Sequence, residues 1–201
     1  MPSSVEQLRQ ERRRKLQVRE SFIRGLQYFR SHPSDPLSFY LAGATYLATG
    51  QRRLIDQDRR LVEILAPRVP GAERDDHQAI EALRSRLDLA NRSLGEFEKA
   101  LEDFRRAGRP GRAGFEAAAD RFLDVLVNVL GARSHSLRHL TTTLLKEEDW
   151  ARIAGITPQS LAAEEERFAA VARAAPKGLD PAGMSAEPPV KPAETLRSRP
   201  T

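Results

Sequence analysis

The chain has 201 residues, of which 40% are hydrophobic and 30% charged, and an excess of lysine and arginine gives a net charge of +5. This length favours one domain with a tail, and no run approaches the roughly 18 apolar residues that a membrane-spanning helix needs. The absence of cysteine excludes disulfides, thiolate metal sites and cysteine nucleophiles. The first residues lack the apolar segment of a secretory signal and include acids, so we expect a cytoplasmic protein.

Prolines mark the boundaries of the predicted elements, because proline disrupts a helix interior but fits its first turn. Asp35-Pro36 and Thr157-Pro158 are typical helix starts, with a capping side chain directly before proline. Glycines and a proline around residue 110 indicate a turn. The expected helices cover residues 4–31, 36–66, 73–107, 113–147 and 158–174.

Apolar residues recur at steps of three and four between these boundaries, most clearly in the third predicted helix. Its seam consists of Ile80, Leu83, Leu87, Ala90, Leu94, Phe97, Leu101 and Phe104. Such a seam is typical of helices packed against other helices, and no segment shows the sustained period-two alternation of a strand.

The sequence therefore predicts an all-α fold: an antiparallel up-down four-helix-type bundle with an additional C-terminal helix and a disordered tail. Residues 1–33 would form the basic N-terminal helix of the bundle, and residues 34–175 the helical bundle domain. Residues 176–201 are rich in proline and small residues, and we expect them to form the disordered tail.

The first 20 residues carry more arginine and lysine than acid. One hypothesis is phosphate binding, on nucleic acid or an anionic membrane face. The other is a solvated helix with ion pairs four residues apart, such as Glu11 with Lys15. We do not expect nucleic acid as a partner, because the first aromatic residue that could stack on a base is Phe22.

Two polar residues, Gln51 and Asp58, fall on the apolar stripe of the second predicted helix. A carboxylate at a core position is costly unless it is paired or bound to a cation. Arg59 and Arg60 could pair with Asp58, or a small rotation of the helix could place Asp58 at the edge of the stripe.

Histidines and carboxylates recur at a spacing that places them on one helix face. Glu81 follows His77 by four residues, and His139 follows His135 by four. Counting residues back from the turns near residues 70 and 110 places Asp58, Glu81 and His139 at the same height along the bundle axis. Imidazole and carboxylate in a bundle core are ligands of non-haem iron or manganese, so all five residues are predicted metal ligands.

A helical bundle with these two pairs resembles the hemerythrin-like (HHE cation-binding) proteins, and the similarity runs from Asp35 to Ile156. It includes the segments LIDQDRRLVEIL and LLKEEDWARIAGIT. The resemblance implies a non-haem iron centre, mononuclear or di-iron, that serves oxygen, redox or iron handling. His77 with Glu81 and His135 with His139 match the family's ligand pairs, whereas Asp58 stands where the family has a first-helix histidine.

Two functions of different classes follow. The first is a metal-binding bundle protein, and the alternative is a non-catalytic interaction bundle that has lost its metal site. In the alternative, the basic N-terminal helix or the C-terminal tail would contact a protein partner. No hydrolase motif is present, and the sequence leaves enzymatic activity and oligomeric state open.

Overall fold

A computed structural model describes residues 4–32, 34–130 and 137–184, and these residues contain no β-strand. The described α-helices are α1 (Ser4–Ser31), α2 (Leu37–Leu65), α3 (Arg74–Ala107), α4 (Arg112–Val125), α5 (Arg138–Leu144), α6 (Glu147–Ala154) and α7 (Pro158–Ala174). The all-α prediction is confirmed.

The start predicted for α7 has the expected capping bonds, whereas at α2 the N-cap residue is Pro36, one residue after the predicted Asp35. At the start of α2, the Asp35 carboxylate accepts a hydrogen bond from the backbone N–H of Leu37 at 3.0 Å. At the start of α7, the Thr157 hydroxyl accepts from the backbone N–H of Ser160, and the Ser160 hydroxyl oxygen accepts from that of Thr157. Both arrangements bind N–H groups that have no partner inside the helix.

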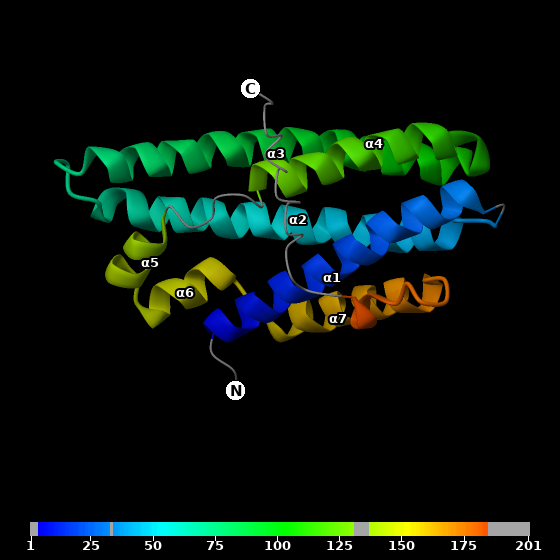
Figure 1. Ribbon diagram of the computed structural model, residues 1–201. Helices are drawn as coiled ribbons and strands as arrows, with labels where there is room; N and C mark the ends of the chain where they lie inside the picture. Colours follow the sequence, from blue (N-terminus) through cyan, green and yellow to red (C-terminus); the bar gives the residue numbers. More distant parts are fainter. Residues whose placement is uncertain (1–3, 33, 131–136, 185–201) are drawn as a thin grey trace, which may run out of the picture.

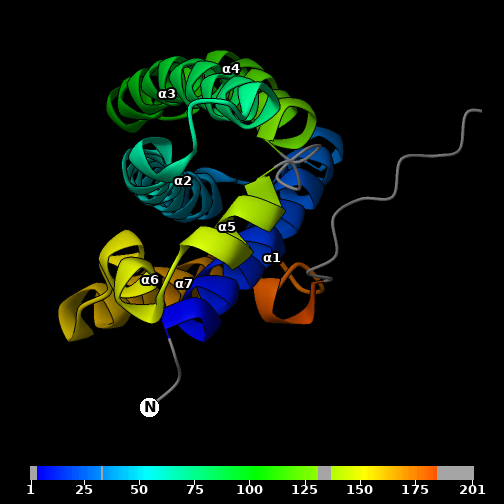
Figure 2. The ribbon, with the colours of Figure 1, turned by 90° about the vertical axis from the view of Figure 1, so that its left-hand side faces the viewer.

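Helix α2 lies in the middle of the molecule (Figure 1). Helices α3 and α4 lie side by side above it, whereas α1 crosses it diagonally on the other side, next to α6 and α7 (Figures 1 and 2). Consecutive helices from α1 to α4 contact one another, and α2 also contacts α6 and α7. The residues of α2 therefore meet partners on opposite sides, which explains its many buried positions.

The main core is aromatic and lies where α1, α2, α3 and α4 meet. The rings of Phe104 and Phe115 stack with centroids 4.7 Å apart, and Tyr40 lies 5.5 Å from Phe115. Two glycines allow α1 and α2 to approach closely: the Phe39 ring covers Gly25 on α1, and the Phe22 ring covers Gly43 on α2. The predicted seam of α3 is confirmed, since all its members are buried except Leu83, which is partly buried.

The predicted fourth helix, 113–147, is wrong beyond its first half. Helix α4 ends at Val125 and continues as a short π-helical segment, Leu126–Leu130, and two separate helices follow after residue 136. The buried Asp149 carboxylate accepts a hydrogen bond from the backbone N–H of Lys146 and two from the Arg68 guanidinium. These bonds set the start of α6, and α5 and α6 cover a second apolar core at the end of α2.

The beginning of the predicted tail packs against α1. Ser21 donates a hydrogen bond to the carbonyl of Leu179 at 2.5 Å, and Gln17 donates to that of Met184 at 3.3 Å. Pro181 and Met184 are buried. The packed part of the chain therefore extends to Met184, and residues 185–201 lie outside the described residues.

Candidate functional site

The predicted metal ligands that the structure describes make separate contacts. The His77 imidazole Nε2 lies 3.3 Å from the carbonyl oxygen of Pro70, and the exposed Glu81 carboxylate pairs with Arg84. On α5, the His139 imidazole Nε2 lies 2.8 Å from an oxygen of Asp76. Asp58 lies 3.5 Å from the Arg12 guanidinium.

Within residues 4–32, 34–130 and 137–184, no group of three histidine, aspartate or glutamate side chains is arranged to hold a metal ion. The level predicted for His139 assumed one continuous fourth helix, and the break after α4 moves His139 to the start of α3 instead. His135 lies outside the described residues. The iron or manganese site stays a prediction.

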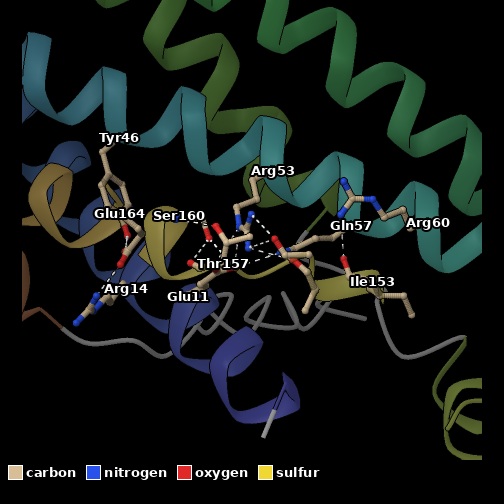
Figure 3. A network of polar contacts seen from close by, with 12 residues as sticks. Glu11, Arg14, Tyr46, Arg53, Gln57, Arg60, Ile153, Thr157, Ser160 and Glu164 are labelled. Atoms are coloured by element: carbon tan, nitrogen blue, oxygen red, sulfur yellow. Dashed lines mark hydrogen bonds and ion pairs between the residues drawn. The ribbon is translucent and has the colours of Figure 1, made fainter. Parts of the chain in front are cut away.

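A pocket of about 320 Å³ lies between α1, α2 and α7 and is open to solvent. This volume is at the lower end of the range of small-molecule sites, about 300–1,000 Å³. Its charged lining residues are Glu11, Arg12, Lys15, Arg52, Arg53, Asp56, Arg60, Glu164 and Arg167. This pocket is the candidate functional site, and Figure 3 shows the polar network around it.

One part of the network joins α1 and α2 to the end of α6. The Glu11 carboxylate accepts hydrogen bonds from Arg53 at 3.0 Å and from Gln57 at 3.1 Å. Arg53 and Gln57 also donate to the carbonyl of Ala154, and Arg60 donates to that of Ile153 (Figure 3). Carbonyls in the last turn of a helix lack helical partners and carry partial negative charge, so these donors stabilise the end of α6.

A second part joins α1 and α2 to α7. The Glu164 carboxylate accepts hydrogen bonds from Arg14 and from the Tyr46 hydroxyl, both at 2.5 Å (Figure 3). Burial and the adjacent Glu164 carboxylate raise the pKa of Tyr46 above its usual range. Arg14 also lies over the Phe168 ring, 5.3 Å from its centroid. Glu164 therefore links α7 to both α1 and α2.

The third part centres on Lys15, whose amine donates a hydrogen bond to the side-chain oxygen of Gln51. Gln51 is only 1% exposed, and its Nε2 has no acceptor among the described residues. Desolvation lowers the pKa of Lys15 to about 7, with the nearby positive charges of Arg19 and Arg12 acting in the same direction and Asp58 opposing them. Lys15 is thus a partly neutral amine on the pocket wall.

Positive charge predominates in the pocket, because six lysine and arginine side chains line it against three carboxylates. Two of these carboxylates, Glu11 and Glu164, are bound by arginines from the same chain. Among the described residues, three lining cations form no ion pair with a carboxylate: Lys15, Arg60 and Arg167. The remaining lining carboxylate, Asp56, is exposed. The arrangement can attract an anion and hold it with charge-assisted hydrogen bonds.

The predicted ion pair between Glu11 and Lys15 does not form. Both residues point from α1 toward α2, where Glu11 binds Arg53 and Lys15 binds Gln51. The position of Gln51 on an apolar stripe of the sequence indicated an unusual polar residue in the core. The sequence gave no indication of Arg167, because only the folded chain brings α7 beside α1 and α2.

Fold and site together define an all-α protein with a cationic pocket beside its central helix. Searches of protein-family models, curated proteins and solved structures found no match to the chain. Among the described residues, no helix combines the length and apolar character required to cross a membrane.

Proposed function

We propose that this protein binds a small organic anion, bearing carboxylate or phosphate groups, in the pocket between α1, α2 and α7. The observation that carries the proposal is the set of three lining cations, Lys15, Arg60 and Arg167, that no carboxylate of the described chain neutralises. Lys15 and Arg167 are partly withdrawn from water, which is costly for an unpaired cation, whereas Arg60 is exposed. An anionic ligand would supply the missing partner.

The electrostatics of Lys15 support the same ligand class. An anion near its amine would favour the protonated form and raise its pKa from about 7. Binding would then take up a proton above neutral pH, and affinity would fall as pH rises above about 7 because the free protein has lost that proton.

The alternative of a protein-interaction bundle with a basic first helix has less support. Arg14 and Lys15 are partly buried and contact Glu164 and Gln51, and the exposed Arg12 lies 3.5 Å from Asp58. Cations that bind other parts of the same chain are less available to a partner.

The test is isothermal titration of the purified full chain with three probes, namely inorganic phosphate, glutarate and 2-hydroxyglutarate. We expect saturable binding of at least one probe, weakened several-fold or more by Arg167→Gln. This substitution breaks no ion pair or hydrogen bond of the described chain, so the fold is expected to persist. Arg92→Gln is the matched control, because Arg92 is exposed on α3 and the substitution changes net charge equally.

Saturable binding that Arg167→Gln weakens and Arg92→Gln does not would support the proposal. Absence of saturable binding for all three probes at millimolar concentration would overturn it. Equal effects of the two substitutions would also overturn it, since binding would then depend on net charge and not on the pocket.

A further inference from the structure

We propose that the ligand of this pocket is amphiphilic, with one carboxylate or phosphate group joined to a hydrocarbon chain. This inference rests on the proposed function, because the cations of the pocket must hold the acid group. It deepens that function by specifying the rest of the ligand. A medium-chain carboxylate is the simplest member of this ligand class.

Leu54 on α2 is the first observation that points to an apolar part of the ligand. It lines the pocket, is only partly buried, and belongs to neither apolar core of the described chain. Transfer of apolar surface from water to an apolar environment is favourable. Hydrocarbon in the pocket would therefore cover a leucine that the described residues leave partly open to solvent.

The second observation is that the pocket surface is mostly apolar, although most of the residues that line it are polar. Their polar atoms bind one another: Arg53 and Gln57 donate hydrogen bonds to Glu11, and Tyr46 donates to Glu164 (Figure 3). The aliphatic parts of long polar side chains provide apolar surface when their head groups are bound elsewhere. The lining thus combines hydrocarbon with a few unpaired cations.

The size of the pocket agrees with a ligand larger than an acid group alone. Its volume is about 320 Å³, whereas one water molecule takes up about 30 Å³ of the liquid. A bare phosphate or carboxylate would leave most of the pocket filled with water against an apolar surface. Small-molecule sites commonly have this combination of an apolar lining and a few polar groups that fix the orientation of the ligand.

The test is isothermal titration of the full chain with butanoate, hexanoate and octanoate, which share one carboxylate and differ only in chain length. Full burial of one methylene strengthens binding about fourfold. Since the pocket is open to solvent, we expect about twofold per methylene, so octanoate should bind about tenfold or more tightly than butanoate. Adipate has the six carbons of hexanoate and a second carboxylate, which would lose water against the apolar lining, so it should bind more weakly than hexanoate.

Leu54→Asn tests the apolar part of the pocket and Arg167→Gln the cationic part. Leu54→Asn should weaken octanoate more than butanoate, whereas Arg167→Gln should weaken both by the same factor. Leu89→Asn is the matched control for the leucine, because Leu89 is 38% exposed on α3 and does not line the pocket. It should leave the affinities for both acids unchanged.

The outcomes separate the two proposals. If the acids bind and Arg167→Gln weakens them, but affinity does not rise with chain length or adipate binds more tightly than hexanoate, the amphiphilic ligand is refuted and anion binding stands. Equal weakening of octanoate and butanoate by Leu54→Asn would also refute it. If no acid binds, or Arg167→Gln has no effect, both proposals are refuted. The chain-length series uses the wild-type chain, so it remains decisive even if Leu54→Asn fails to fold.

Discussion

Replacing Gly43 with alanine tests how closely α1 and α2 approach each other. A Cβ at this position would lie 2.5 Å from Cδ2 of the Phe22 ring, and Phe22 is fully buried. The ring has no free space to move into, because it also packs against Phe39 and Tyr40 with centroids 6.0 Å away in each case. The substitution must therefore displace the helices or distort the ring.

Two opposing contributions determine the magnitude. Alanine favours a helix interior over glycine by about 1 kcal/mol, whereas overpacking a close-packed core costs about 1–3 kcal/mol. Since the fully buried Phe22 ring places the overpacking cost near its upper end, we expect Gly43→Ala to lower the free energy of unfolding by about 1–2 kcal/mol. For a chain of this size that corresponds to a fall in Tm of roughly 2–8 °C.

The measurement is urea unfolding of both the wild type and the variant, with Gly95→Ala as the matched control. Gly95 is exposed within α3 and has nothing within 4 Å of its Cβ position, so alanine there should raise stability by about 0.5–1 kcal/mol. Combining Gly43→Ala with Phe22→Leu should recover part of the loss. A Gly43→Ala variant as stable as the wild type would refute the close approach of the helices.

Three further predictions concern the core, the α6 start and the metal ligands. Leu94→Ala should lower the free energy of unfolding by roughly 2–5 kcal/mol in urea, since Leu94 is completely buried, and a loss under about 0.5 kcal/mol would contradict its place in the core. The bonds from Arg68 and the Lys146 N–H lower the pKa of Asp149 from 3.8 to about 2, so their stabilisation is present above pH 3.8 and is lost as pH falls toward 2. Asp149→Asn should therefore destabilise the protein at neutral pH, with a difference from the wild type that shrinks in acid; a difference independent of pH would contradict this linkage. If the predicted iron or manganese site exists, His139→Ala should abolish stoichiometric metal measured by mass spectrometry after purification without chelator, and unchanged metal content would exclude His139 as a ligand.

Local patterns in the sequence were sufficient for the helices whose boundaries depend on nearby residues. The apolar spacing from Ile80 to Phe104 predicted both the existence of α3 and the face that it buries, because packing against other helices requires one apolar stripe. Thr157-Pro158 predicted the start of α7 because its capping bonds form within four residues. These features needed no knowledge of distant contacts.

The division of the fourth predicted helix depended on contacts that the sequence does not display. Asp149 is one of three consecutive acidic residues, and only the approach of Arg68, three residues after the end of α2, distinguishes it from Glu147 and Glu148. The prediction that placed His139 at the level of Glu81 assumed an unbroken fourth helix, so the predicted set of metal ligands contains the same error.

The sequence by itself determined the all-α class, the amphipathic face of α3 and the unusual polar position of Gln51. Only the tertiary structure decided that Lys15 faces Gln51 instead of pairing with Glu11, and that Arg167 joins it at the pocket. The physical reason is that helical periodicity specifies which side chains share a face, whereas a pKa or a pocket depends on which faces meet. The contact of Lys15 with Gln51 joins residues 36 positions apart, and Arg167 lies more than a hundred positions from both, separations that no local pattern encodes.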